Sequence, residues 1–366
     1  MSYLERAAEL LAAIRAKGQY RAVERYQQGD VLDFASNDYL ALATDRRVVQ
    51  AFRNAHRVGS GGSRLLGGRH REHSLLEEEL AAWLGRERVL LFSSGYHAAL
   101  GAIPALARTV RTIYSDALNH ASLIDGIRLS HADRVVYPHR ALPPREQRSG
   151  PALVVTESIF SMDGDAAGLP AMLAALGDDD VLLVDEAHAL GVVGPQGAGL
   201  AHGLDDPRVV VLGTLSKAFG GSGGFVAGPA AIVDLLVNTA RTFIFDTAPP
   251  PALALAARVA LVAVRQGDDA RARLYDAVER TRLGLRSLGL PVIEDRSPIV
   301  PVILGDEGRT ERVARELLGK RVYAPAIRPP TVPPGTSRLR LSLRADHRNE
   351  HIDLLIGSLR ACIATS

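Results

Sequence analysis

The feature that most constrains the fold is a regular alternation between residues 89 and 228, where short apolar runs are separated by segments of helical periodicity. The runs lie at 89–92, 112–114, 134–137, 153–156, 181–184, 209–212 and 225–227. This alternation is typical of α/β domains, in which helices bury both faces of a mostly parallel sheet. We therefore predict an α/β fold built on a mostly parallel, seven-stranded sheet.

Polar residues follow several of these runs at the points where the predicted strands end. They are Glu157 and Ser161 after 153–156, Asp185 and His188 after 181–184, and Thr214, Ser216 and Lys217 after 209–212. The first run leads into a helix that begins near Gly95 and Tyr96, and the free N–H groups of a helix N-terminus suit a phosphate. Because ligands bind beyond the carboxyl ends of strands in such sheets, we expect a ligand site there.

Lys217 narrows the chemistry of this expected site. Only three of the 43 Lys and Arg residues are lysines, Lys17, Lys217 and Lys320, and Lys217 lies inside the turn TLSKAFG. A primary amine condenses with an aldehyde, whereas a guanidinium does not deprotonate and cannot replace it. We interpret Lys217 as the anchor of a phosphorylated aldehyde cofactor, pyridoxal phosphate. A solvated lysine in a surface loop is the alternative.

Asp185 and His120 are compatible with the same cofactor. Asp185 directly follows four apolar residues, and a buried carboxylate needs a cationic partner. A protonated pyridine nitrogen is such a partner, and the pairing keeps the ring electron-poor. An N-cap role or an arginine partner is the alternative for Asp185. His120 begins another predicted helix, where its imidazole could stack on a ring, although a lone histidine is usually structural.

Outside the α/β unit, the sequence predicts two smaller parts. Residues 1–36 form an N-terminal helical segment, in which Ser2 and Glu5 have the spacing of a capping box. The large unit spans 37–265, with a helix from about Ser74, and residues 251–288 are helical with an interruption near Gly267. Residues 266–366 form a smaller α+β unit, with a strand at 299–304 and helices at 310–318 and 349–363.

Residues 337–343 alternate polar and apolar side chains, which predicts a half-buried strand with Arg340 on its polar face. The guanidinium of Arg340 suits a substrate carboxylate. A solvated sheet face is the default alternative.

Composition excludes several classes of partner. The net charge is only +2 and no run of like charges occurs, so neither nucleic acid nor a membrane is an expected partner. The single cysteine, Cys362, excludes an intrachain disulfide and a cysteine-rich metal site, and no metal is expected. No early hydrophobic signal region or 18-residue apolar run is present, so we expect a cytoplasmic protein.

From Asp33 nearly to its end, the chain resembles the α-oxoamine synthases, which are fold-type I pyridoxal phosphate enzymes. The shared stretches are FASNDYLAL, GSGGSRLLGG, NHASLIDG, TESIFSMDGD, VDEAHALGVVGPQGAG, TLSKAFG and AIRPPTVPPGTSRLRLSL. The 32-residue spacing from Asp185 to Lys217 also matches the family. The resemblance implies an aspartate aminotransferase-like fold, a homodimer, and the decarboxylative condensation of an amino acid with an acyl thioester. The AIRPPTVP segment favours the biotin-pathway branch, which uses L-alanine and a pimeloyl thioester of coenzyme A or acyl-carrier protein.

The resemblance also implies roles for individual residues. Lys217, Asp185 and His120 are the expected catalytic residues. With the strand-end residues, the expected cofactor site comprises Gly95, Tyr96, His120, Glu157, Ser161, Asp185, His188, Thr214, Ser216 and Lys217. The expected substrate contacts are Asn37, Thr331, Arg340 and, as a looser match in the N-terminal segment, Arg21.

Alternatives remain inside and outside this family. Glycine C-acetyltransferase, 5-aminolevulinate synthase and serine palmitoyltransferase would use the same residues. A catalytically silent subunit would be expected to lack Lys217, and a nucleotide-binding protein would need Rossmann or P-loop spacings that are absent. The chain departs from the family pattern in the short link between Arg21 and Asp33, at Ala99 where asparagine is usual, and at 188–191, where HALG replaces the frequent HGTG.

Overall fold

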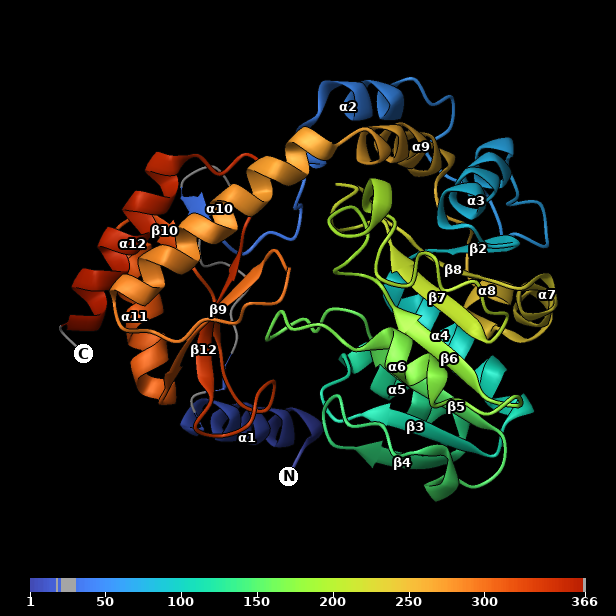
Figure 1. The fold of residues 1–366 in the computed structure, drawn as a ribbon, viewed down its shortest axis with the longest axis horizontal. Coiled ribbons are helices and arrows are strands. Elements are labelled where there is room, and N and C mark those ends of the chain that lie inside the picture. The colour runs from blue at the N-terminus through green and yellow to red at the C-terminus, as the bar shows by residue number, and fades with distance from the viewer. Residues whose placement is uncertain (18, 21–30, 365–366) are drawn as a thin grey trace.

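The computed structural model describes residues 1–17, 19–20 and 31–364, which form two units with separate sheets (Figure 1). The larger unit contains a seven-stranded sheet and the smaller one a three-stranded sheet. Helix α9 (Pro251–Arg265) lies over the larger unit, and α10 (Asp268–Ser287) runs from there to the smaller one. The predicted helical stretch at 251–288 is thus interrupted near Gly267, as expected. The division of the chain at residues 36 and 265 is our proposal.

The seven-stranded sheet confirms the predicted α/β fold. Its strands are β2 (Arg88–Phe92), β3 (Thr112–Asp116), β4 (Asp133–Tyr137), β5 (Ala152–Glu157), β6 (Val181–Asp185), β7 (Val209–Thr214) and β8 (Gly224–Gly228), in the order β2-β8-β7-β6-β5-β3-β4. Strand β8 is antiparallel to both neighbours and every other pair is parallel. Each predicted apolar run lies within one strand. Burial on both faces is wrong for β4, an edge strand whose first four residues are exposed.

Helices cover both faces of this sheet because successive strand residues point to opposite sides. Leu183 and Val210 pack in a core with α4 (Gly95–Leu106), α5 (Ala121–Ser130) and α7 (Ala230–Thr239). Leu182 and Val184 belong to the opposite core, with α3 (Arg71–Leu84), α6 (Leu169–Ala174) and α9. Helix α3 begins three residues before the predicted start at Ser74. Strands β2, β3, β5, β6 and β7 run in the same direction, so their carboxyl ends meet at one edge of the sheet.

The smaller unit packs three helices beside an antiparallel sheet. Its strands are β9 (Ile299–Gly305), β11 (Ala326–Ile327) and β12 (Ser337–Ser342), and α11 (Glu307–Gly319) and α12 (Asn349–Ala364) lie with α10. Strand β1 (Leu32–Asp33) pairs with β10 (Val322–Tyr323), which ties the chain before Asn37 to this unit. The prediction of a half-buried strand at 337–343 is wrong, because all six residues of β12 are buried, Arg340 included. On the face that was expected to be solvated, Arg340 and Arg338 contact Ser161 and Asp163 of the larger unit.

Helix α1 (Tyr3–Ala16) begins at the predicted capping box of Ser2 and Glu5, and none of its residues is buried. The other helices are α2 (Arg46–Arg53) and α8 (Arg241–Ile244), with 3₁₀ turns η1 (Leu42–Thr44), η2 (Ala107–Thr109), η3 (Arg145–Gln147) and η4 (Pro195–Gly197). Among the helices described here, none has the length and apolar character needed to cross a membrane.

Candidate active site

Lys217 lies in the turn between β7 and β8, at the carboxyl edge of the sheet. Its Nζ is 2.8 Å from Nε2 of His188. Burial lowers the pKa of Lys217 to about 8, although the charges of Asp185 and Glu157 raise it and that of Arg340 lowers it further. An amine with this pKa is partly neutral near pH 7, as a nucleophile or proton acceptor must be.

Two buried carboxyl groups end the neighbouring strands β5 and β6. Glu157 and Asp185 are directly paired across these parallel strands. Asp185 Oδ1 accepts a hydrogen bond of 2.9 Å from the N–H of Ala187, and Glu157 Oε1 is buried without a hydrogen-bond partner among the described residues. Burial raises the pKa of both groups, and the charge of Asp185 further raises that of Glu157. A cationic N–H group would therefore be stabilised beside them.

The start of α4 and the end of β7 form a cradle for an anion. A Cβ added at Gly95 would lie 3.1 Å from the Cβ of Thr214, so glycine is what allows the helix N-terminus to approach the strand. Thr214 Oγ1 lies 2.8 Å from Ser216 Oγ. Tyr96 follows Gly95 and its hydroxyl donates to Asp125. The predicted residues Gly95, Tyr96, Thr214 and Ser216 thus gather where the N–H groups of a helix N-terminus favour a phosphate.

Arg340 reaches this edge from the smaller unit. Its Nη1 donates to Asn37 Oδ1 at 3.1 Å and to Ser342 Oγ at 2.8 Å, and its Nε donates to the carbonyl of Ser161. Three predicted residues, Asn37, Ser161 and Arg340, are therefore in contact although they belong to three separate parts of the chain.

Tyr39 also belongs to this group, although it was not among the predicted site residues. Its side chain is fully buried, and its hydroxyl lies 2.6 Å from His188 Nδ1 and 3.1 Å from Asn37 Oδ1. Burial raises the pKa of Tyr39 to about 12, so the hydroxyl stays protonated at neutral pH. Its position two residues after Asn37 is the sequence signal that could have identified it.

His120 is the N-cap of α5, as predicted, and its Nδ1 is 2.8 Å from Ser122 Oγ. The ring is partly exposed. Loss of surrounding water lowers the pKa of His120, and the charges of Lys217 and Arg340 act in the same direction, whereas Asp185 raises it. A neutral imidazole with an accessible face results, which is compatible with stacking on a ring.

Thr331 and Arg21 are the remaining predicted substrate contacts. Thr331 lines a cavity of about 420 Å³, together with Phe160 and with Asn119, which precedes His120 in the sequence. Arg21 lies outside the described residues.

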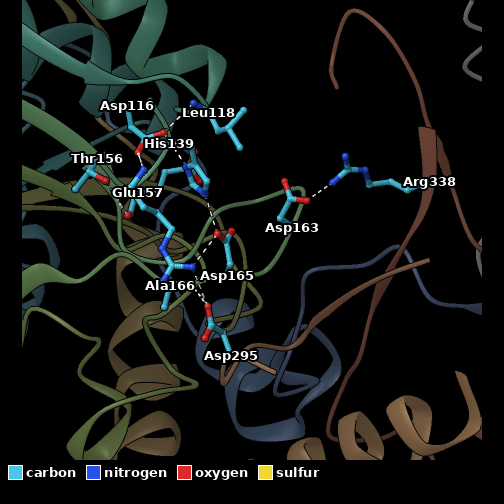
Figure 2. Close-up of polar contacts among 11 residues, drawn as sticks. Asp116, Leu118, His139, Thr156, Glu157, Asp163, Asp165, Ala166, Asp295 and Arg338 are labelled. Carbon is cyan, nitrogen blue, oxygen red and sulfur yellow. Dashed lines mark hydrogen bonds and ion pairs between the residues drawn. The ribbon is translucent and has the colours of Figure 1, made fainter. Parts of the chain in front are cut away.

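Figure 2 shows how the loop that carries Ser161 is held. His139 bridges two carboxylates, with Nδ1 2.9 Å from Asp116 Oδ1 and Nε2 2.7 Å from Asp165 Oδ2. Burial lowers the pKa of His139, but the hydrogen bonds and charges of Asp116 and Asp165 outweigh it, so the net pKa is raised. His139 thus ties the segment after β4 to Asp116, at the end of β3, and to the loop after β5.

Two contacts from the smaller unit hold the same loop (Figure 2). Arg338 on β12 forms an ion pair with Asp163, and Asp295 Oδ2 accepts a hydrogen bond of 2.8 Å from the N–H of Ala166. The position of the loop therefore depends on both units.

His139→Gln is expected to reduce stability most in mildly acidic solution. Because the folded-state pKa is raised above the ordinary value of 6.5, the charged bridge contributes fully below about pH 6 and its contribution is lost as pH rises through the folded pKa. We expect a loss on the order of 1 kcal/mol from urea unfolding at pH 5.5, shrinking at pH 9. The exposed His56→Gln is the control. A loss that grows with pH would contradict this account of His139.

These residues fit pyridoxal phosphate. The buried carboxylate of Asp185 suits a protonated ring nitrogen, the amine of Lys217 suits the aldehyde, and the cradle at Gly95 and Thr214 suits the phosphate. Within residues 1–17, 19–20 and 31–364, no group of His, Cys, Asp and Glu side chains is arranged to hold a metal ion. The fold and this edge of the sheet therefore define a pyridoxal phosphate-dependent enzyme.

Comparisons with known proteins agree. Residues 29–359 match the aminotransferase class I and II family. The chain is 46% identical, over 335 residues, to the 8-amino-7-oxononanoate synthase of Burkholderia thailandensis, covering 87% of this chain and 85% of the relative. A Sphingomonas wittichii serine palmitoyltransferase structure has a TM-score of 0.90 and 29% identity and covers 100% of this chain and 99% of its own. The 8-amino-7-oxononanoate synthase of Francisella tularensis has a TM-score of 0.77 and 28% identity, with 92% and 98% covered.

The chain belongs to the α-oxoamine synthases, within the aminotransferase class I and II family. Solved serine palmitoyltransferase structures that are similar to this chain contain pyridoxal phosphate. The chain is a pyridoxal phosphate-dependent acyltransferase.

Proposed function

We propose that this enzyme condenses L-alanine with a pimeloyl thioester to give 8-amino-7-oxononanoate, carbon dioxide and the free thiol, in biotin biosynthesis. The observation that carries the proposal is a chain of hydrogen bonds that joins the amine of Lys217, whose pKa is lowered, to the buried guanidinium of Arg340. The 46% identity to an 8-amino-7-oxononanoate synthase supports this choice of substrates.

Bound pyridoxal phosphate supplies an electron-poor ring that stabilises negative charge on the substrate carbon next to the amine. Lys217 would hold the cofactor, Asp185 would keep a proton on the ring nitrogen, and His120 would stack on the ring. Ser161 and His188 would bind the phenolic oxygen, and Glu157 would belong to the same site. Gly95, Tyr96, Thr214 and Ser216 would bind the phosphate.

Substrate handling is assigned to Arg340 and Asn37, which bind the alanine carboxylate. Nζ of Lys217, once neutral, takes the Cα proton, and the same carbon attacks the thioester carbonyl and expels the thiol. The β-keto acid then loses carbon dioxide, and the carbon regains a proton, with His120 as an acid near the carbonyl. Thr331 contacts the acyl chain in the 420 Å³ cavity. The acyl carrier is coenzyme A or acyl-carrier protein.

The test is product formation by the purified enzyme. Alanine, glycine and serine are each combined with pimeloyl, acetyl, succinyl and palmitoyl thioesters, and products are identified by mass spectrometry. We expect alanine with pimeloyl thioester to react fastest. The preference for alanine over glycine should be modest, since one methyl group supplies about 1–3 kcal/mol of discrimination. Faster turnover of glycine with acetyl-CoA would identify a glycine C-acetyltransferase, and serine with palmitoyl thioester a serine palmitoyltransferase.

Arg340→Lys is expected to weaken alanine binding by about 1–3 kcal/mol, because a point charge cannot reproduce the two-pronged guanidinium contact with a carboxylate. The measurement is the alanine concentration dependence of turnover. Arg280→Lys, at an exposed ion pair with Asp353, is the control. Unchanged alanine dependence in Arg340→Lys would place the carboxylate elsewhere.

A homodimer is also proposed. Exposed apolar side chains support it, namely Leu4 on α1 at 76%, and Val58 at 95% and Leu66 at 85% in the segment between α2 and α3. Sedimentation at micromolar concentration should give twice the chain mass of 39.1 kDa. A fully active monomer would refute this.

A further inference from the structure

A continuous chain of hydrogen bonds joins the proposed carboxylate site to the reactive amine. Arg340 Nη1 lies 3.1 Å from Asn37 Oδ1, which lies 3.1 Å from the hydroxyl of Tyr39. The hydroxyl is 2.6 Å from His188 Nδ1, and His188 Nε2 is 2.8 Å from Lys217 Nζ. Tyr39 is the middle link of this chain.

The direction of the bond from the Tyr39 hydroxyl to Asn37 Oδ1 determines the tautomer of His188. A guanidinium has no acceptor, so the Asn37 atom that faces Arg340 is the oxygen. The Tyr39 hydroxyl then donates to this oxygen, and its own oxygen is left to accept from Nδ1–H of His188. Nε2 of a neutral imidazole with Nδ1 protonated is a bare acceptor. It therefore accepts from the amine of Lys217.

We propose that Tyr39 is a positioning residue for the reaction: its hydroxyl sets the tautomer and orientation of His188, and through His188 it controls how tightly Lys217 holds its proton. The proposal rests on the function above only in taking Lys217 as the reacting amine. A bare Nε2 stabilises the protonated amine by accepting from it. Loss of the hydroxyl leaves Nδ1–H buried without its partner, which favours the other tautomer, with Nε2–H against Lys217. That arrangement favours the neutral amine.

Other charged groups around Lys217 stay in place when the hydroxyl is removed. Asp185 and Glu157 face it from the ends of β6 and β5, and Arg340 from β12. Burial is the main cause that lowers the pKa of His188, and the charges of Lys217, Arg340 and His120, at the start of α5, lower it further. Because Tyr39→Phe changes none of these charges, any change in the proton affinity of Lys217 is caused by loss of the Tyr39 hydroxyl.

The test uses the small number of lysines. The full-length chain without added cofactor is pulsed with acetic anhydride across a pH series, and acetylation at Lys217 is quantified by peptide mass spectrometry. Lys17 and Lys320, both exposed, are internal references for the reagent. We expect a midpoint near pH 8 for Lys217 in the unchanged chain. In Tyr39→Phe the midpoint should fall by about one pH unit, a tenfold loss of proton affinity.

Tyr275→Phe is the matched control, because it removes a tyrosine hydroxyl that donates to the carbonyl of Val192 at 3.1 Å. Its Lys217 midpoint should equal that of the unchanged chain. Asn37→Ala is the second variant and carries the test if Tyr39→Phe does not fold. It removes the acceptor of the Tyr39 proton, frees the hydroxyl to donate to His188, and should lower the midpoint too.

Cofactor trapping in the holoenzyme distinguishes a failure of the proposed role of Tyr39 from a failure of the proposed function. If borohydride fixes the cofactor on Lys217 and the midpoint is the same in Tyr39→Phe and the unchanged chain, the role of Tyr39 is refuted and the proposed function stands. If the cofactor is fixed on another lysine, the proposed function fails as well.

Discussion

Replacing Lys217 with alanine is expected to reduce turnover on the order of 10⁴-fold or more. Loss of a general base alone costs about 10²–10⁴-fold, and this variant also loses the amine that binds the cofactor covalently. Borohydride reduction of the unchanged holoenzyme should add the cofactor mass to the peptide that contains Lys217. The Lys217→Ala enzyme should show no such adduct.

Lys320→Ala is the control for this prediction, because Lys320 is exposed at the end of α11. That variant should retain turnover and the adduct on Lys217. Reduced cofactor found on Lys17 or Lys320 in the unchanged enzyme would contradict the assignment of Lys217.

Asp185→Asn is expected to slow exchange of the alanine Cα proton by several orders of magnitude while the cofactor stays bound. Asp185 is 6% exposed, and an amide at this position cannot hold a proton on the ring nitrogen as a carboxylate does. The ring would then stabilise less negative charge, an effect on the order of 5 kcal/mol or more. Deuterium incorporation into alanine, followed by NMR, measures the exchange rate.

Asp206→Asn is the comparison variant, since Asp206 pairs with Arg208 just before β7, at the opposite end of that strand from Lys217. Its exchange rate should be unchanged. If the Asp185→Asn enzyme exchanges the proton at the normal rate, a group other than Asp185 keeps the proton on the ring nitrogen.

The strands were predictable because a strand that is buried on both faces is a run of consecutive apolar residues. The run at 181–184 reads as a strand without reference to any other part of the chain, and the structure places it in the centre of the sheet as β6. Strand β4 is the exception. Its run at 134–137 resembles the others, but its first four residues are exposed, whereas the last four of β2, at the other edge of the sheet, are buried. Whether other elements cover a strand depends on tertiary packing, which local periodicity does not contain.

The site was predictable to the extent that it follows from strand ends. Asp185, Glu157 and Lys217 share the carboxyl edge because parallel strands end together. His188 follows the run at 181–184 and Arg340 lies on the alternating strand, whereas the resemblance to the α-oxoamine synthases added Asn37. The structure brings these three into one hydrogen-bonded group with Lys217.

By itself, the sequence determined the α/β class, the strand positions and the lysine that defines the chemistry, because each depends on residue type and short-range pattern. Tertiary structure alone decided that Arg340 is buried and that Tyr39 links it to Lys217. Those contacts join residues 303 positions apart, for Asn37 and Arg340, and 149 apart, for Tyr39 and His188. No local periodicity encodes such contacts, since each depends on how distant parts of the chain pack together.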